Sequence, residues 1–244
     1  AVVNDMHEHD SVMQVLFKDA KGKYDFVCFN GDMTSAVDST AEIRIHYMNT
    51  ASKLFASDTP LYLCRGNHEY RGNDAIKYVD YFQTPTGKTY YSASYGKYFF
   101  LFLDSGEDKV DSDIRNLDIM MTEKYVQEEA EWLKTVVESE EYKNAEVKIA
   151  FCHIPPSPTG WYGNATVSKY FVPLLNGTGL DLMLCAHIHK YSYREAGKNG
   201  CDFPVLCNAN QQRLDATVDK NGIKIEIYDA SGAKLHSLKF EKKK

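Results

Sequence analysis

The sequence predicts an α/β fold in which two β-sheets pack face to face as a sandwich and helices flank both outer surfaces, giving four layers. Three observations support this prediction. Short apolar runs alternate with helical stretches, one central segment has the pattern of a hairpin, and the chain from 191 to 240 is mostly strand-like. Alternating strands and helices are typical of parallel βαβ units, whereas consecutive strands form an antiparallel meander. With 244 residues, we expect a single domain over 1–244.

The strands are predicted from apolar runs and turn residues. Runs without polar interruption are typical of strands buried on both faces, and they occur at 24–29, Leu61–Cys64, Val147–Cys152 and 181–185. A β-hairpin is expected over 90–105 with its turn near Gly96 and Lys97. The strand-like C-terminal region is expected to turn at 220–222 and 231–232.

Three segments have apolar residues at helical spacing. They are 11–20, with Ser11 as the expected N-cap, 41–57, and Thr122–Val137, with Thr122 as the expected N-cap. Each of these helices lies between predicted strands, which is the arrangement that places helices outside the sheets.

Charge and composition exclude several classes of protein. The net charge is −6, from 28 Lys and Arg against 34 Asp and Glu, so we expect no binding of extended nucleic acid. No apolar run has the roughly 18 residues that a membrane span requires, so no transmembrane segment is expected. The six cysteines fall mostly in apolar runs and are interpreted as core thiols, with a Cys201–Cys207 disulfide as the less favoured alternative.

Polar residues gather where the predicted strands end. In chain order these are Asp5 and His7, then Asp32, then Asn67 with His68 and Glu69, then His153, then His187 and His189. Ligands of α/β proteins bind outside the carboxyl ends of strands. Five of the eight histidines occur at these positions, while His46 and His236 are interpreted as surface residues and His9 stays open. Carboxylate, amide and imidazole ligands suit zinc, manganese or iron.

These blocks resemble the calcineurin-like metallophosphoesterase superfamily. The resemblance extends from Asp5 to His189, and Leu103–Glu107 and His153–Pro156 are most similar to the purple-acid-phosphatase-like branch. It implies a double β-sandwich flanked by helices and two metal ions in the cleft. On the matching positions, the first metal would be held by Asp5, His7 and His189, the second by Asn67, His153 and His187, and Asp32 would bridge them.

The chain departs from its relatives at three points. Purple acid phosphatases have a metal-ligating tyrosine three residues after the bridging aspartate, where this chain has Ser35, so we expect no ferric–tyrosinate centre. The segment from Gly31 to Val37 lacks the second Asp and the Arg of the protein Ser/Thr phosphatases, which argues against that type. Ala186 replaces the glycine that usually precedes the His-x-His pair, and we expect this site to stay functional.

We therefore expect a metal-dependent phosphatase-like hydrolase that cleaves a phosphate monoester with a metal-bridging hydroxide. Two adjacent cations, divalent or trivalent Fe, Mn or Zn, lower the pKa of a shared water, and His68 is the expected general acid. The alternatives are a phosphodiesterase acting on small or cyclic nucleotide diesters, and a weakly catalytic module that binds phosphate ligands.

The substrate is expected to be a small phosphate ester. Arg71 would bind a phosphate oxygen, and Trp161 and Tyr162 would contact a ring. Trp161 is equally well explained as a local hydrophobic plug, and Arg65 as an ion-paired scaffold residue. Glu69 is interpreted as a structural acceptor. The chain begins three residues before the predicted strand end at Asn4, so we expect native sequence upstream of Ala1. By analogy with relatives, that sequence would be a β-sandwich domain and the protein would be exported, periplasmic or secreted.

Overall fold

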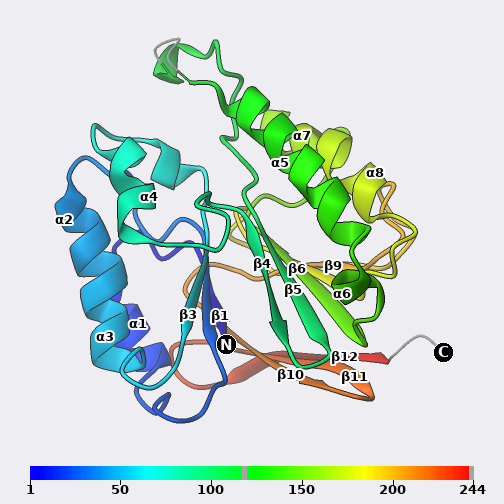
Figure 1. Ribbon diagram of the computed structural model, residues 1–244. Helices are drawn as coiled ribbons and strands as arrows, with labels where there is room; N and C mark the ends of the chain where they lie inside the picture. Colours follow the sequence, from blue (N-terminus) through cyan, green and yellow to red (C-terminus); the bar gives the residue numbers. More distant parts are fainter. Residues whose placement is uncertain (117–119, 242–244) are drawn as a thin grey trace.

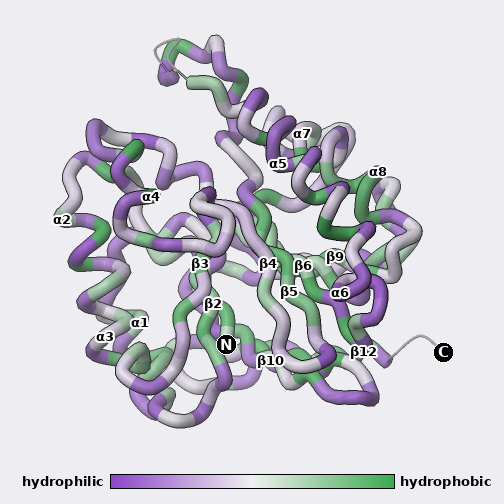
Figure 2. The backbone as a smooth tube through the Cα atoms, viewed as in Figure 1, coloured by the Kyte–Doolittle hydropathy of each residue, from purple (hydrophilic) through white to green (hydrophobic). Residues whose placement is uncertain are grey.

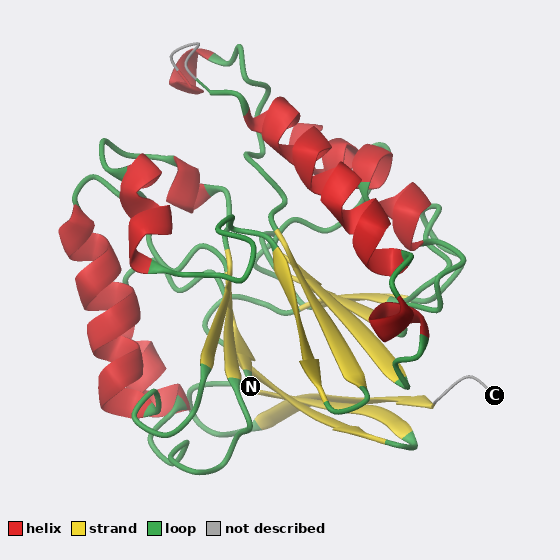
Figure 3. Cartoon of the chain, in the orientation of Figure 1, coloured by secondary structure: helices red, strands yellow, loops and turns green. Residues whose placement is uncertain are grey.

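Two mixed β-sheets lie face to face between two groups of helices in the computed structural model, which describes residues 1–116 and 120–241 (Figures 1 and 3). Each sheet has six strands. The four-layer α/β sandwich that the sequence predicts is confirmed. Figure 2 shows hydrophobic residues concentrated on the central strands and hydrophilic ones on the outer turns of the helices and in the loops.

The first sheet combines the beginning and the end of the chain. Its strand order is β12-β11-β10-β1-β2-β3, in which β1, β2 and β3 are parallel and β10, β11 and β12 form an antiparallel meander. The strands are β1 (Val2–Val3), β2 (Val27–Asn30), β3 (Leu61–Cys64), β10 (Arg213–Asp219), β11 (Gly222–Tyr228) and β12 (Lys234–Glu241). Two-residue β1 is held in the sheet because β2 pairs on one side of it and β10 on the other.

The second sheet is built from the middle of the chain, in the order β4-β5-β6-β7-β9-β8. Strands β5, β6, β7 and β9 are parallel, and β4 and β8 are antiparallel edge strands. The strands are β4 (Tyr91–Tyr95), β5 (Tyr98–Leu103), β6 (Val147–Cys152), β7 (Leu182–Cys185), β8 (Ser192–Arg194) and β9 (Val205–Cys207). The predicted hairpin is therefore β4–β5, with its turn at Gly96 and Lys97.

Helices cover each sheet on its outer face. The first sheet is covered by α1 (Asp10–Leu16), the continuous helix α2 (Thr40–Glu42), η1 (Ile43–Asn49) and α3 (Thr50–Leu54), and α4 (Tyr78–Tyr81). The second is covered by α5 (Thr122–Val137), α6 (Glu140–Lys143), α7 (Tyr162–Tyr170) and α8 (Val172–Leu175). Short turns occur at η2 (His68–Tyr70), η3 (Ala75–Lys77) and η4 (Ile114–Asn116). Among the helices in the described part of the chain, none is long and apolar enough to cross a membrane.

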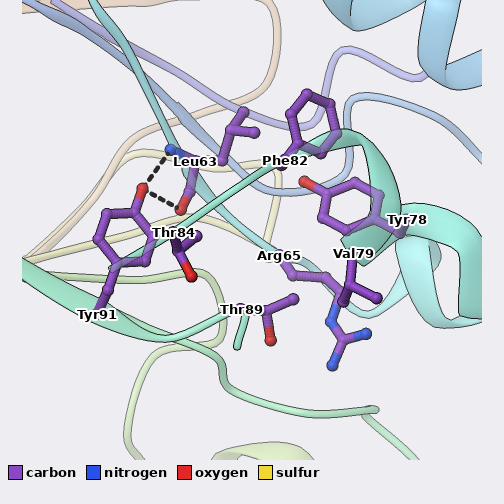
Figure 4. A pocket seen from close by; sticks show the side chains of 8 residues that line it. All are labelled: Leu63, Arg65, Tyr78, Val79, Phe82, Thr84, Thr89 and Tyr91. Atoms are coloured by element: carbon purple, nitrogen blue, oxygen red, sulfur yellow. Dashed lines mark hydrogen bonds between the residues drawn. The ribbon is translucent and has the colours of Figure 1, made fainter. Parts of the chain in front are cut away.

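Aromatic side chains fill the space between the sheets. The Phe102 ring stacks on Phe151 with centroids 5.0 Å apart, and on Tyr62 of the opposite sheet at 4.9 Å. Tyr91 of β4 also joins the sheets by hydrogen bonds (Figure 4), because its hydroxyl accepts from the Leu63 N–H at 2.8 Å and donates to the Leu63 carbonyl at 2.9 Å. This packing fixes the strand ends of one sheet relative to those of the other.

Some predicted details are wrong. Ser11 lies inside α1, whose N-cap is His9, and Thr122 is the first residue of α5, whose N-cap is Met121. The Asp111 carboxylate takes the role expected of Thr122, because it accepts hydrogen bonds from the backbone N–H groups of Thr122 and Glu123.

All six cysteines are buried free thiols, so Cys201 and Cys207 form no disulfide.

Candidate metal centre

The seven predicted ligand residues converge at the carboxyl ends of strands from both sheets. The first sheet contributes Asp5 and His7 after β1, Asp32 after β2 and Asn67 after β3; the second contributes His153 after β6, and His187 and His189 after β7. Neither sheet alone carries a complete set.

The candidate ligand atoms lie close enough to share metal ions. They form the groups Asp5–His7–His189 and Asp32–His153–His187, and His68 forms a third group with His7 and Asp32. The ligand atoms within each group lie within 4.8 Å of one another. His153 Nε2 is 3.0 Å from Asp32 Oδ2 and 3.8 Å from Asp5 Oδ1, so the first two groups are adjacent. Asn67 Oδ1 lies 3.0 Å from His187 Nδ1. This arrangement agrees with the two ligand sets that the family resemblance implies, with Asp32 next to both.

The backbone at these residues is strained. Asp5, His7, Asp32, His187 and His189 all have positive φ, between 41° and 69°. Residues with a side chain rarely adopt this conformation, and it persists where the surrounding structure enforces it, often at functional sites. Five of the seven candidate ligand residues thus have this strained conformation.

Two glycines allow the loops to approach this closely. A Cβ atom on Gly31 would lie 2.8 Å from the Cα of Gly66, and one on Gly66 would lie 2.6 Å from the backbone nitrogen of Asp32. Both distances are shorter than any ordinary carbon contact. Ala186 is fully buried, and its N–H donates to the His153 carbonyl at 2.8 Å.

Neighbouring polar groups orient the candidate ligands. Asp5 Oδ2 accepts from Asn4 Nδ2 at 2.7 Å and from the His187 N–H at 3.0 Å, and Asp32 Oδ1 accepts from the His68 N–H at 2.9 Å. The Nδ1 atom of His153 lies 2.8 Å from the Asn30 carbonyl, which leaves Nε2 directed at the two carboxylates. Such partners fix the tautomer and rotation of a ligating imidazole.

Glu69 holds the loops together, as its predicted structural role requires. Its fully buried carboxylate accepts hydrogen bonds from the backbone N–H groups of Asp32 (3.0 Å), Met33 (2.9 Å) and Gly66 (2.8 Å), and from the Tyr47 hydroxyl. The carboxylate therefore ties the loop after β2 to the loop after β3. It faces backbone donors and takes no position among the ligand atoms.

Electrostatics divide the candidate ligands into charged and neutral groups. Burial alone would lower the pKa of His153, but attraction to Asp32 and Asp5 outweighs it and raises this pKa to about 10. Burial lowers the pKa of His187 to about 4, assisted by repulsion from His153. Burial also lowers the pKa of His7. At neutral pH His7 and His187 thus present lone pairs, which metal binding requires.

The site has the unsatisfied polar atoms that a metal centre needs. Asp5 Oδ1, His7 Nε2 and His153 Nε2 are buried and form no well-aligned hydrogen bond, although His153 Nε2 lies 3.0 Å from Asp32 Oδ2 and Asp5 Oδ1 lies 3.2 Å from His189 Nε2. Buried polar atoms are almost always paired, so three exceptions in one place call for a further ligand. Nitrogen and carboxylate oxygen donors at this spacing suit two cations such as Zn, Mn or Fe. The residues therefore fit a dinuclear metal centre.

Comparison with protein families agrees with this geometry. The model of the calcineurin-like phosphoesterases matches residues 1–191, which contain every candidate ligand. The chain belongs to the calcineurin-like phosphoesterase family. It is therefore a metal-dependent phosphoesterase. Among curated proteins, none matches this phosphoesterase.

Solved structures share the fold of this phosphoesterase. A purple acid phosphatase from yellow lupin (Lupinus luteus) seeds has a TM-score of 0.70 at 15% identity, over 98% of this chain and 53% of the lupin chain. A dimetal phosphatase from Danio rerio has a TM-score of 0.69 at 11% identity, over 99% of this chain and 98% of the Danio rerio chain. GAP50, the anchor in the inner membrane complex of Plasmodium, has a TM-score of 0.67 at 14% identity, over 100% of this chain and 88% of the GAP50 chain. The phosphoesterase thus spans about half the length of the lupin protein.

The predicted catalytic residue His68 lies beside the candidate ligands. Its ring meets that of His7 edge to face with centroids 4.7 Å apart, and its Nε2 is 4.0 Å from Asp32 Oδ2. Its Nδ1 lies 2.7 Å from the Ser35 carbonyl. Ser35 takes the place of the purple-acid-phosphatase tyrosine, and its hydroxyl donates to Glu8 at 2.8 Å. His68 is thus placed at the centre but held mainly by backbone.

The predicted substrate residues lie at different distances from the candidate ligands. Arg71 binds Glu107 through Nε and Nη2, at 3.1 and 2.8 Å, while its Nη1 lies 3.1 Å from His68 Nε2. The Trp161 ring lies 6.3 Å from that of His187 and is 70% exposed. The Tyr162 hydroxyl points to Glu123 of α5, 3.2 Å away. Arg71 and Trp161 border the centre, whereas the Tyr162 hydroxyl is engaged elsewhere.

Several supporting residues were not identified from the sequence. Asn208 donates to Asn4 Oδ1 at 3.0 Å and so fixes the amide that orients Asp5. Tyr47 supports Glu69, and Glu107 holds Arg71. Asn4, adjacent to Asp5, and Glu107, at the end of the Leu103–Glu107 motif, carried a signal in the sequence. Arg65 proves to be scaffold, because its Nε donates to buried Asp104 at 2.7 Å.

Proposed function

We propose that this phosphoesterase hydrolyses phosphate monoesters at a dinuclear metal centre, with His68 as the general acid. The observation that supports this most is the convergence of seven candidate ligand residues from both sheets, with His68 at their edge. Asp5, His7 and His189 would hold one metal, Asn67, His153 and His187 the other, and Asp32 both. When bound, the metals supply a nucleophile at neutral pH and neutralise charge on the phosphoryl group.

The roles of the protein groups follow from their contacts. The Nδ1–H of His68 donates to the Ser35 carbonyl, so the proton that His68 transfers would be carried on Nε2 of the doubly protonated ring. Arg71 Nη1 now lies against that Nε2, and a phosphoryl oxygen would draw Nη1 away, because a charged oxygen is the stronger acceptor. Substrate binding would thus free Nε2, which would take up a proton from solvent and pass it to the leaving oxygen. Glu107 and Asp108 keep the rest of the Arg71 guanidinium in place.

The test is the variant His68→Asn, assayed on monoesters with leaving groups of increasing basicity at matched metal content. Alkyl esters need protonation of the leaving oxygen, so their turnover should fall by roughly 10²–10⁴, the usual contribution of general acid catalysis. Aryl esters with acidic leaving groups should lose much less. Both metals should be retained.

The matched control is His236→Asn, since His236 lies on β12 and stacks on Tyr191. It should leave all rates unchanged. An equal loss across the leaving-group series would contradict the acid role and assign His68 to positioning. A parallel assay with aryl diesters tests the phosphodiesterase alternative. Faster turnover of diesters than of monoesters would contradict the monoester assignment.

Export from the cell and a β-sandwich domain upstream of Ala1 stay predictions from the family resemblance. Mass spectrometry of the native protein tests both, because it gives the native N-terminus.

A further inference from the structure

A groove of about 610 Å³ opens directly beside the metal centre. One wall is the loop after β6, with Pro155 and Trp161, and the other is the loop after β7, from His187 to Lys190. Its floor carries Ser192 and Arg194 of β8 and Cys207 of β9. Two candidate ligands, His187 and His189, line it, so a molecule in the groove reaches the metals. The volume lies in the range of small-molecule sites.

Two cations in the groove, Lys190 and Arg194, have no carboxylate partner within the described part of the chain. Neither Lys190 nor Arg194 forms an ion pair with any residue in 1–116 or 120–241. By comparison, Arg65 and Arg71 near the same centre are both paired with buried carboxylates. In a chain of net charge −6, two such cations in one groove form a local site for an anion.

Apolar surface lies in the same groove as these cations. Trp161 is 70% exposed and Ile188 is 37% exposed, and both line the groove. Large exposed apolar side chains at the rim of a pocket are typical of ligand contacts. An indole face can stack on any nucleobase, because every base has a π-face.

The groove is preformed. Ser192 and Arg194 are alternate residues of β8 and so project from the same face of that strand, which pairs with β9. The opposite wall is fixed by Asn164, whose Nδ2 donates to the Pro155 carbonyl at 2.7 Å, and whose carbonyl accepts from the Ser157 N–H at 3.2 Å. A groove whose backbone is already in place needs less ordering when a ligand binds.

We propose that this groove binds the second phosphate group of a nucleotide that carries at least two. Lys190 and Arg194 would hold that phosphate, Trp161 would stack on the base, and the terminal phosphoryl group would lie at the metals. The proposal rests on the proposed function, which it extends from phosphate esters in general to nucleoside diphosphates and their relatives. A single-phosphate aryl ester would leave the two cations unused.

Binding tests the groove independently of turnover. With a chelator present, AMP and ADP are titrated into the protein while Trp161 fluorescence is followed, and Trp161→Leu identifies the signal of this residue. ADP should bind more tightly than AMP. In Lys190→Ala/Arg194→Ala the affinity for ADP should fall by about 10- to 100-fold, the usual loss for charge-assisted hydrogen bonds, and the preference over AMP should disappear. Lys53→Ala on α3 is the control.

Turnover of the metal-loaded protein then separates the two proposals. The double variant should lose about 10- to 100-fold in kcat/KM for ADP but less than about threefold for p-nitrophenyl phosphate. Equal losses on both substrates, or unchanged preference for ADP in the binding assay, would overturn the groove proposal. Failure of the wild-type protein to hydrolyse either substrate, with ADP binding intact, would overturn the proposed function instead.

Discussion

Asp32 lies between the two candidate metal sites. Its Oδ1 accepts from the His68 N–H, and its Oδ2 lies 3.0 Å from His153 Nε2. We expect Asp32→Ala to lose both metals, because two adjacent cations would lack the carboxylate that neutralises them. His7→Ala should weaken chiefly one site. Elemental analysis after gel filtration measures the metal content of each variant.

The exposed carboxylate Asp38 provides the control for this experiment. Asp38→Ala should bind two metal ions per chain, like the wild type. Two equivalents retained by Asp32→Ala would show that another residue bridges the metals.

Glu129, which is not one of the candidate metal ligands, should make the stability of the fold depend on pH. It is fully buried, its Oε1 accepts from the Asp104 N–H at 2.9 Å, and its Oε2 has no partner. Burial, and secondarily the charge of Asp104, raise its pKa well above the usual value. The folded state therefore binds more protons than the unfolded state, so the free energy of unfolding should decrease as pH rises from about 4.3, the ordinary glutamate pKa, towards the raised value.

Glu129→Gln removes this titration. Urea unfolding of the chelated protein at several pH values should show a shallower decrease in the variant, by at most about 1.4 kcal/mol per pH unit. Glu131→Gln, on the exposed side of the same helix, is the matched control and should behave like the wild type. Identical slopes for wild type and Glu129→Gln would mean that Glu129 is not the group responsible.

At the scale of elements, the helix over 40–54 shows how an irregular turn serves the site. Its central section η1 is a π-helix, and such insertions are rare and frequently occur at functional sites. The π-helix carries Tyr47, whose hydroxyl donates to Glu69 beneath the metal centre. An irregularity of the helix is thereby linked to the loops that carry Asp32 and Asn67.

Tyr47→Phe should lower the free energy of unfolding by about 1.5–3 kcal/mol, because the Glu69 carboxylate loses one charge-assisted hydrogen bond in a buried site. Urea unfolding in the presence of a chelator measures this. Tyr62→Phe removes a hydroxyl from a partly exposed ring and serves as the control. Equal stability of the two variants would contradict a supporting role for Tyr47.

The regular elements could be predicted from the sequence, but their caps and irregular turns could not. Strands β3 and β6 and helix α5 match the prediction at both ends, because continuous apolar runs and helical periodicity are local signals. The cap of α5 comes from Asp111, eleven residues before Thr122, and Tyr47 of the π-helix packs against Phe29 of β2. Contacts between distant residues leave no local pattern.

The same distinction applies to the candidate site. All seven candidate ligands were predicted because each follows an apolar strand within a recognisable motif. The groove cations Lys190 and Arg194 belong to no recognisable motif. Their proposed role depends on the edge strand β8, which pairs antiparallel with β9. Asn208 is also invisible in the sequence, since its partner Asn4 is 204 residues away.

At the scale of the whole molecule, the candidate ligand set links the two sheets. Asp5, Asp32 and Asn67 follow strands of one sheet, and His153 and His187 follow strands of the other. Bound metals should therefore stabilise the folded protein as a whole, by about 2.7 kcal/mol at a free metal concentration one hundred times Kd. Thermal unfolding with and without chelator should show a clear decrease in Tm on metal removal.

Asp32→Ala again supplies the comparison, since its Tm should respond little to the chelator. A wild-type Tm that is unaffected by chelation under metal-replete starting conditions would contradict metal binding across the sheets.

The position of β1 imposes an order of events during synthesis. The side chain of Asn4, which orients Asp5, is fixed by the carbonyls of Asn208 and Ala209 and by the side-chain amide of Asn208. Asn208 leaves the ribosome 204 residues after Asn4. Strand β1 likewise pairs with β10, which begins at Arg213. Contacts of such long sequence separation form late and slow folding. Until Asn208 has been translated, Asp5 is held through β2 and the Gly31 carbonyl and lacks the oriented Asn4 amide, so a metal captured earlier would be held by an immature set of residues.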